Sequence, residues 1–120
     1  KDEKYLMEVK GCTLEIDGIG YFPDAPSERA VRHLHELMHA VKQGYHCILA
    51  FVIAMPGVMV VRPNMTTHPA FGQALSEAMA AGVEVWYLPC EITADSIQIK
   101  GRKRKYYSVQ DRLYPHVVIQ

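Results

Sequence analysis

The sequence has few cysteines, no long apolar run and no excess charge of either sign. Only three of its 120 residues are cysteines, and no two of them form a Cys-x-x-Cys motif. An odd, scattered set of cysteines argues against a disulfide framework and favours a reducing compartment, so we expect a cytoplasmic protein. No apolar stretch approaches the roughly 20 residues that span a bilayer, so we expect no membrane partner. These features exclude disulfide-rich and membrane-spanning classes.

Acidic and basic residues balance over the whole chain but are unevenly distributed. Thirteen Lys and Arg against thirteen Asp and Glu give a formal net charge of zero. Residues 1–99 nevertheless carry a net charge of −5, and residues 100–120 carry +5. A run of basic residues followed by two tyrosines suits contact with phosphates and stacking on bases, although a solvated connector is an equal alternative. The candidate nucleic-acid-binding residues of this run are Lys100, Arg102, Lys103, Arg104 and Lys105.

What the sequence does have is the composition and patterning of one folded domain. With 49% hydrophobic and 22% charged residues, it is typical of a soluble globular protein. Apolar periodicity predicts helices over 27–43, capped by Asp24 or Ser27, and from 67 or 69 to 82. Strands are expected over 5–10, 13–16, 19–22, 47–55, 58–61 and 83–88, with another within 92–99. Asp17-Gly18 predicts a tight hairpin between the second and third of these strands. The apolar run 47–55 is typical of a strand covered on both faces, and 58–61 is expected to return beside it. This order predicts an α/β fold with a mixed sheet flanked by helices.

The first candidate for chemistry is the run from His35 to His39, which reads H-E-x-x-H. On a helix, His35 and His39 can bind one zinc ion while Glu36 activates a water molecule, as in zinc endopeptidases. The longer zinc pattern requires a glycine and a third histidine, where this chain has Lys42 and Tyr45. Helical spacing also turns Glu36 and His39 away from the apolar stripe, so a solvated helix face is the alternative.

The second candidate is an E-x-K motif formed by Glu8 and Lys10 on a predicted strand. Residues two apart on a strand project from the same face. A carboxylate that holds a divalent ion beside an ammonium suits phosphodiester hydrolysis, but such a site requires further carboxylates. The only carboxylates before Glu8 in the sequence are those of Asp2 and Glu3, and neither is well placed to share a metal ion with it. On its own, the motif is more simply a surface ion pair.

Several blocks of sequence resemble the sugar fermentation stimulation proteins. They include EVKGCTL at 8–14, FPDAPSER at 22–29 and HL at 33–34, followed in the same order by similar blocks up to about residue 99. The resemblance implies an OB-like DNA-binding domain followed by a restriction-endonuclease-like domain, with this chain providing most of the second. We therefore expect residues 1–99 to form this nuclease-like C-terminal domain, and residues 100–120 to be a basic C-terminal tail without a family counterpart.

The resemblance also assigns roles to individual residues. It implies that Glu8 and Lys10 are the E-x-K half of a PD-(D/E)xK catalytic site, with Glu8 and Asp24 as metal ligands for Mg²⁺. It places Arg29 and His33 in the same cleft as nucleic-acid-binding residues, and Arg29 also as a catalytic residue that steadies the scissile phosphate.

The family pattern and this chain differ at three points. The partner aspartate would lie upstream of Lys1, so we expect the chain to lack the first elements of the fold. Ala30 replaces a usual glycine, and His68 replaces an aspartate that is common before Pro69.

Three functions follow from these patterns. The favoured one is a Mg²⁺-dependent nuclease domain that acts on DNA or RNA and partners the OB-like domain of its parent chain. The alternative is a non-catalytic DNA-binding regulator of sugar (maltose) metabolism. The distant alternative is a zinc endopeptidase that uses His35, Glu36 and His39.

Overall fold

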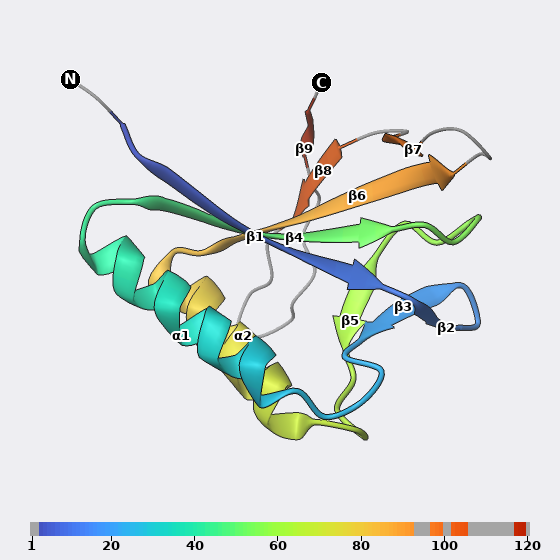
Figure 1. Cartoon of the computed structure of the whole chain (residues 1–120), viewed down its shortest axis with the longest axis horizontal. Coiled ribbons are helices and arrows are strands. Elements are labelled where there is room, and N and C mark those ends of the chain that lie inside the picture. Colours follow the sequence, from blue (N-terminus) through green and yellow to red (C-terminus); the bar gives the residue numbers. More distant parts are fainter. Residues whose placement is uncertain (1–2, 93–96, 100–101, 106–116, 120) are drawn as a thin grey trace.

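The amphipathic segments fold as two helices packed on one side of a mixed sheet. The computed structural model describes residues 3–92, 97–99, 102–105 and 117–119. The elements along the chain are β1 (Tyr5–Cys12), β2 (Leu14–Ile16), β3 (Ile19–Phe22), α1 (Glu28–Lys42), β4 (His46–Ile53), β5 (Val61–Pro63), α2 (Pro69–Ala81), β6 (Glu84–Ile92), β7 (Ile97–Ile99), β8 (Arg102–Lys105) and β9 (Val117–Ile119) (Figure 1).

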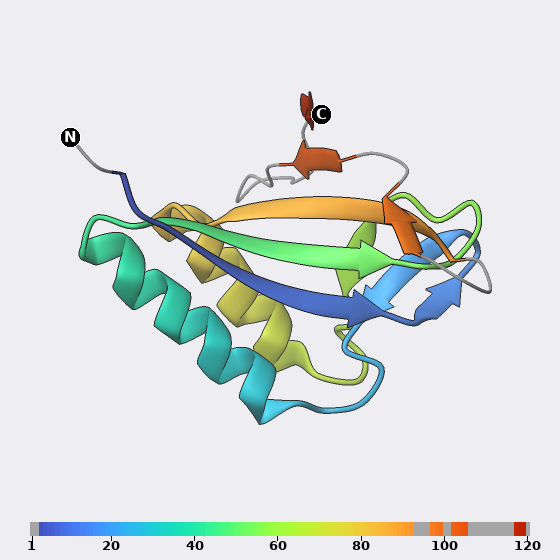
Figure 2. The same cartoon turned by 45° about the horizontal axis from the view of Figure 1, so that its top comes forward.

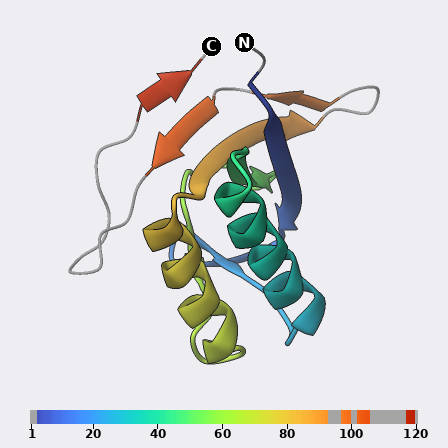
Figure 3. The same cartoon turned by 90° about the vertical axis from the view of Figure 1, so that its left-hand side faces the viewer.

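The main sheet has the strand order β1-β4-β6-β8-β9, and β7 pairs with β6. Strands β1, β4 and β6 run parallel, whereas β7 and β8 lie antiparallel to β6 and β9 lies antiparallel to β8. The predicted mixed α/β fold is therefore confirmed. Both helices cover the same face of the parallel strands (Figure 2), and they lie side by side there (Figure 3).

Local signals in the sequence account for the helix ends and the hairpin. The Ser27 side chain caps α1 by accepting a hydrogen bond from the Ala30 N–H. Helix α2 begins at a proline and ends at Gly82, which has a left-handed φ of 113°. Asp17 and Gly18 both adopt positive φ between β2 and β3, as the tight-hairpin signal predicts. Both predicted helices and the hairpin are confirmed.

One predicted strand is wrong in extent and in partner. Residues 58–61 are expected to return beside the strand that precedes them, but β5 begins only at Val61 and pairs with β3 in a second sheet of order β2-β3-β5. The reason is that β4 already has β1 on one edge and β6 on the other, so neither edge is left for a returning strand.

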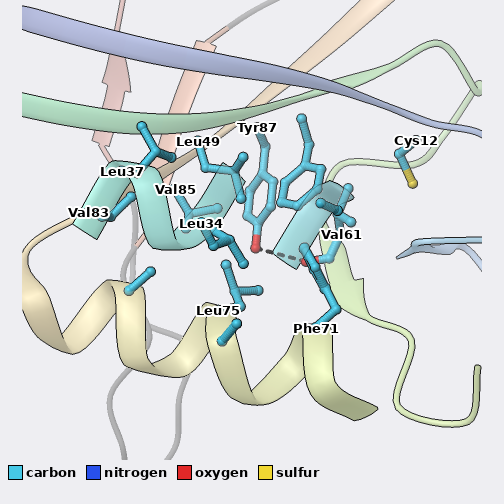
Figure 4. Packing of buried hydrophobic residues seen from close by; sticks show 14 of the residues in the cluster. Cys12, Leu34, Leu37, Leu49, Val61, Phe71, Leu75, Val83, Val85 and Tyr87 are labelled. Carbon is cyan, nitrogen blue, oxygen red and sulfur yellow. Dashed lines mark hydrogen bonds between the residues drawn. The ribbon is translucent and has the colours of Figure 1, made fainter. Parts of the chain in front are cut away.

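The core lies between the sheet and the helices. Leu34 and Leu37 of α1 and Phe71 and Leu75 of α2 pack there against Tyr87 of β6, and the Tyr87 hydroxyl donates to the Val61 carbonyl at 3.0 Å (Figure 4). On the opposite face of the sheet, a smaller buried cluster consists of Ile48, Ala50 and Leu88. Strand β4 is thus covered on both faces, as its continuous apolar sequence predicts.

The cysteines are free, as expected. Cys12 and Cys47 are buried and Cys90 is half-buried, and burial raises the pKa of all three thiols. Within the described ranges, no helix combines the length and apolarity needed to cross a membrane.

Candidate functional site

Strand β1 changes character along its length and presents two polar side chains beside α1. Its residues are mostly exposed, but Glu8 and Lys10 are partly covered and Cys12 is buried. These three residues alternate along the strand, so they share one face. The side chain of Lys10 is 14% exposed and that of Glu8 is 34% exposed. The E-x-K pair therefore lies at the margin of the core, where water still reaches the carboxylate.

Helix α1 adds a third group to this pair. His33 lies in the second turn of α1, and its side chain is 14% exposed. Its Nδ1 atom is 2.6 Å from Lys10 Nζ and 3.1 Å from Glu8 Oε2, and Lys10 Nζ is 3.4 Å from the same carboxylate oxygen. We call Glu8, Lys10 and His33 the polar cluster. It brings a carboxylate, an ammonium and an imidazole to one point.

Two further predicted site residues lie on α1 and in the segment just before it. Arg29 is exposed and lies four residues before His33, so the two share one side of the helix. Among the described residues, Arg29 has no ion-pair partner within 4.0 Å. Asp24 is exposed in the segment that leads into α1. The helix thus places a cationic side chain one turn from the polar cluster.

The carboxylates of the described chain do not form a complete metal site. No group of three or more His, Cys, Asp or Glu side chains that could hold a metal ion occurs among the described residues. Magnesium, however, is commonly bound by only one or two carboxylates, with water and substrate phosphates completing its shell. Glu8 fits the role of one such ligand, but the described residues do not build a closed cage around it.

The H-E-x-x-H residues lie elsewhere and do not support zinc chemistry. His35, Glu36 and His39 are all exposed on α1, and no described residue completes a group of three ligands with them. The physical reason is the helical turn: burial of Leu34 and Leu37 directs the two histidines and the glutamate toward solvent. The zinc hypothesis is not favoured.

His35 instead lines a shallow pocket at the start of both helices. The pocket has a volume of about 410 Å³ and is lined by Glu28, Val31, Arg32, His35, His68 and Ala70. His68 also joins the two helices, since its Nδ1 accepts a hydrogen bond from the Ser27 N–H at 3.0 Å. His68 therefore provides a hydrogen-bond acceptor beside the start of α1.

The basic run forms part of the main sheet. Lys100 lies outside the described residues, whereas Arg102–Lys105 form β8. In the register with β6, Lys103 is opposite Tyr87, Arg104 is opposite Trp86 and Lys105 is opposite Val85. Four consecutive cationic residues thus occupy a strand on the opposite side of β4 and β6 from β1.

Sequence reasoning placed His33 in the cleft but missed its contact with Lys10. The two residues are 23 positions apart, and their contact depends on how α1 lies against β1. The alternation of β1 and the helical spacing of α1 indicated which sides of the two elements carry polar groups. Neither pattern indicated that those sides meet.

The fold and the polar cluster define a class of protein: a mixed α/β domain with a partly buried Glu-Lys-His cluster at the edge strand of its sheet. Residues 1–96 match the family model for the sugar fermentation stimulation protein RE domain. The chain belongs to this family.

Curated relatives and a solved structure support the same family. The chain is 50% identical over 95 residues to a sugar fermentation stimulation protein homolog from Desulfitobacterium hafniense (strain Y51), covering 79% of this chain and 42% of the relative. A homolog from Clostridium beijerinckii is 46% identical over 100 residues, covering 83% of this chain and 44% of the relative. This chain therefore spans less than half the length of these relatives.

A structural neighbour is the SfsA protein of Pyrococcus furiosus, solved in complex with Ca²⁺. The TM-score is 0.75 at 29% sequence identity, and the match covers 82% of this chain and 43% of the neighbour. The likeness supports the arrangement of strands and helices described above.

Proposed function

We propose that this domain is the catalytic part of a Mg²⁺-dependent phosphodiesterase that cleaves nucleic acid on a restriction-endonuclease-like core. The observation that carries the proposal is the polar cluster, in which Glu8 and Lys10 project together from the edge strand of the sheet. A surface ion pair would need neither partial burial nor a third partner, whereas both side chains are partly covered and His33 contacts both. The RE-domain description of the matching family agrees with this reaction class.

The relative's calcium supports a site for a divalent cation. The Pyrococcus furiosus protein was solved with Ca²⁺, which, like Mg²⁺, prefers oxygen ligands. In this chain Glu8 would be one ligand, and Asp24 is the second carboxylate we assign to the ion. When bound, the cation would neutralise charge on the phosphate and lower the pKa of a bound water.

Each cationic residue then has a separate task. The Lys10 ammonium lies 3.4 Å from the Glu8 carboxylate, so it is placed to stabilise the negative charge that develops on the phosphate in the transition state. Arg29, one helical turn from His33, can donate two parallel hydrogen bonds to a phosphate group. The reaction consumes one water: its oxygen bonds to phosphorus, the P–O bond to the leaving sugar oxygen breaks, and that oxygen takes up a proton.

Strand β8 would extend the binding surface for the nucleic acid. Arg102–Lys105 lie three strand spacings from β1, about 14 Å at the usual separation of strands. Basic residues at this distance from the polar cluster can contact further phosphates of the same nucleic-acid strand. This contact predicts binding that weakens as the salt concentration rises.

The test measures cleavage of labelled single- and double-stranded DNA and RNA by the full 120-residue chain with Mg²⁺ or Mn²⁺. Glu8→Gln preserves the shape of the side chain but removes its charge, and we expect cleavage to fall at least about 100-fold. The matched control is Glu77→Gln, at an exposed glutamate on α2 that accepts a hydrogen bond from Gln73 at 3.3 Å.

Three outcomes would contradict the proposed function. A chain that binds nucleic acid but leaves it intact under every condition would instead be a binding protein. Cleavage that survives Glu8→Gln would place the chemistry elsewhere. Peptide hydrolysis that requires bound zinc and is lost in His35→Ala would instead support the zinc hypothesis.

A further inference from the structure

We propose that His33 is a positioning residue: its Nδ1 accepts a hydrogen bond from the Lys10 ammonium and holds it beside Glu8. The inference deepens the proposed function and rests on it for its effect on the reaction. It starts from one contact, the 2.6 Å separation of Lys10 Nζ and His33 Nδ1, which joins residues 23 positions apart.

The chemistry of the three groups determines the tautomer of His33. Its Nδ1 lies near both a donor, Lys10 Nζ at 2.6 Å, and an acceptor, Glu8 Oε2 at 3.1 Å. An ammonium can only donate, so Nδ1 can contact it at this distance only through its lone pair. With Nδ1 as the acceptor in the shorter contact, the ring N–H of His33 is assigned to Nε2.

The surroundings make His33 a better anchor for Lys10 than Glu8 is. A lysine side chain has four flexible methylene groups and must lose rotamer freedom to act at one place. The Glu8 carboxylate lies farther from Lys10 Nζ, at 3.4 Å. Once it binds a cation, its negative charge is partly neutralised and attracts Lys10 less strongly. His33, in contrast, is on a helix whose start is capped by Ser27, and its side chain is mostly buried. The imidazole thus remains an acceptor for Lys10 when Glu8 is engaged.

A pair of near-isosteric variants tests this role. In His33→Asn an amide oxygen can occupy the δ position of the missing nitrogen, whereas His33→Gln carries its amide one atom farther, at the ε position. We expect the Asn variant to retain cleavage within about three-fold of the unsubstituted chain, and the Gln and Ala variants to lose about 10- to 100-fold, the loss that a small misplacement of a reacting group produces. His39→Ala, on the exposed side of the same helix, is the control.

A double variant distinguishes positioning from a merely structural role. If His33 acts through Lys10, His33→Ala should cause no further loss of cleavage in a Lys10→Met background, because the positioned group is already absent. Losses that multiply in the double variant, or equal losses in the Asn and Gln variants, would overturn the proposal.

A second measurement does not depend on activity. Nitrogen NMR of the histidine rings in the free chain at pH 8 should show His33 with an unprotonated, hydrogen-bonded Nδ1 and a protonated Nε2, and the Nδ1 signal should shift in Lys10→Met. A proton on Nδ1 would overturn the inference whether or not the chain cleaves nucleic acid. If the ring result is as expected but no variant or condition yields cleavage, the contact stands and the proposed function fails.

Discussion

Strands β1 and β4 have the same length and pair along all their residues, yet they have opposite characters. Each has eight residues, and the parallel register runs from Tyr5 opposite His46 to Cys12 opposite Ile53. Six of the eight β4 residues are buried, whereas only Cys12 is buried on β1. The difference arises because β4 lies between β1 and β6, with apolar clusters on both of its faces, while β1 is the outermost strand of the sheet.

The comparison shows why the polar cluster is on β1. Glu8 is opposite Leu49 and Lys10 is opposite Phe51, so the apolar core and the polar cluster occupy neighbouring positions of one sheet face. Charged groups are costly to bury without partners, and a site that exchanges water and substrate must reach solvent. An edge strand meets both requirements. Its open edge reaches solvent, while the face that carries Glu8 and Lys10 still packs against the rest of the domain.

The largest expected effect is on β4. Phe51 is 1% exposed and its ring contacts those of Phe22 and Tyr87, so Phe51→Ala should lower the free energy of unfolding by about 3–5 kcal/mol. The residue opposite it on β1 provides the comparison: Lys10→Met keeps most of the apolar stem but removes the ammonium that contacts Glu8 and His33, and should cost less, about 1 kcal/mol. Urea unfolding of both variants checks the contrast, and similar losses would contradict it.

An intermediate effect is expected at Gly20 of β3, which lies against Cys12 at the buried end of β1. A Cβ added at Gly20 would lie 2.9 Å from Cys12 Sγ and 3.2 Å from the Val60 carbonyl oxygen. Gly20→Ala should therefore cost about 1–3 kcal/mol through overpacking.

Gly11, one residue before Cys12, provides a matched control for that variant. No atom lies within 4 Å of a Cβ added there, so Gly11→Ala should change stability by less than about 0.5 kcal/mol. Equal urea midpoints for the two alanine variants would mean that the end of β1 is packed no more tightly than the rest of the strand.

The smallest effect is expected on the open part of β1. Val9 is 52% exposed and is opposite the fully buried Ala50 of β4. Val9→Thr should change the free energy of unfolding by less than about 0.5 kcal/mol, since a surface position loses little by gaining a hydroxyl. A loss above 1 kcal/mol in the same urea experiment would indicate that Val9 is covered in solution.

Prediction from the sequence succeeded where a signal is local. The cap at Ser27, the glycine at 82 and the Asp17-Gly18 turn each act within a few residues, and the elements that they bound are confirmed. Prediction failed for residues 58–61, whose apolar side chains suit any open strand edge. The choice between the edge of β4 and that of β3 depends on which edges other strands have already taken.

The candidate site likewise depends partly on local signals in the sequence and partly on tertiary packing. Alternation along β1 indicated that Glu8 and Lys10 share a face, and the family resemblance, confirmed by the match over residues 1–96, drew attention to Asp24, Arg29 and His33. Only the packing of α1 against β1 brought His33 to within 2.6 Å of Lys10.

The sequence by itself determined the helices, the hairpin, the apolar interior strand and the motif that marks β1, because these depend on periodicity and on neighbours in the chain. The tertiary structure alone decided that β1 lies at the sheet's edge, that β5 joins a second sheet and that the E-x-K pair gains an imidazole partner. Those outcomes depend on competition between distant surfaces for the same partners, and no local sequence pattern indicates which of these surfaces will pair.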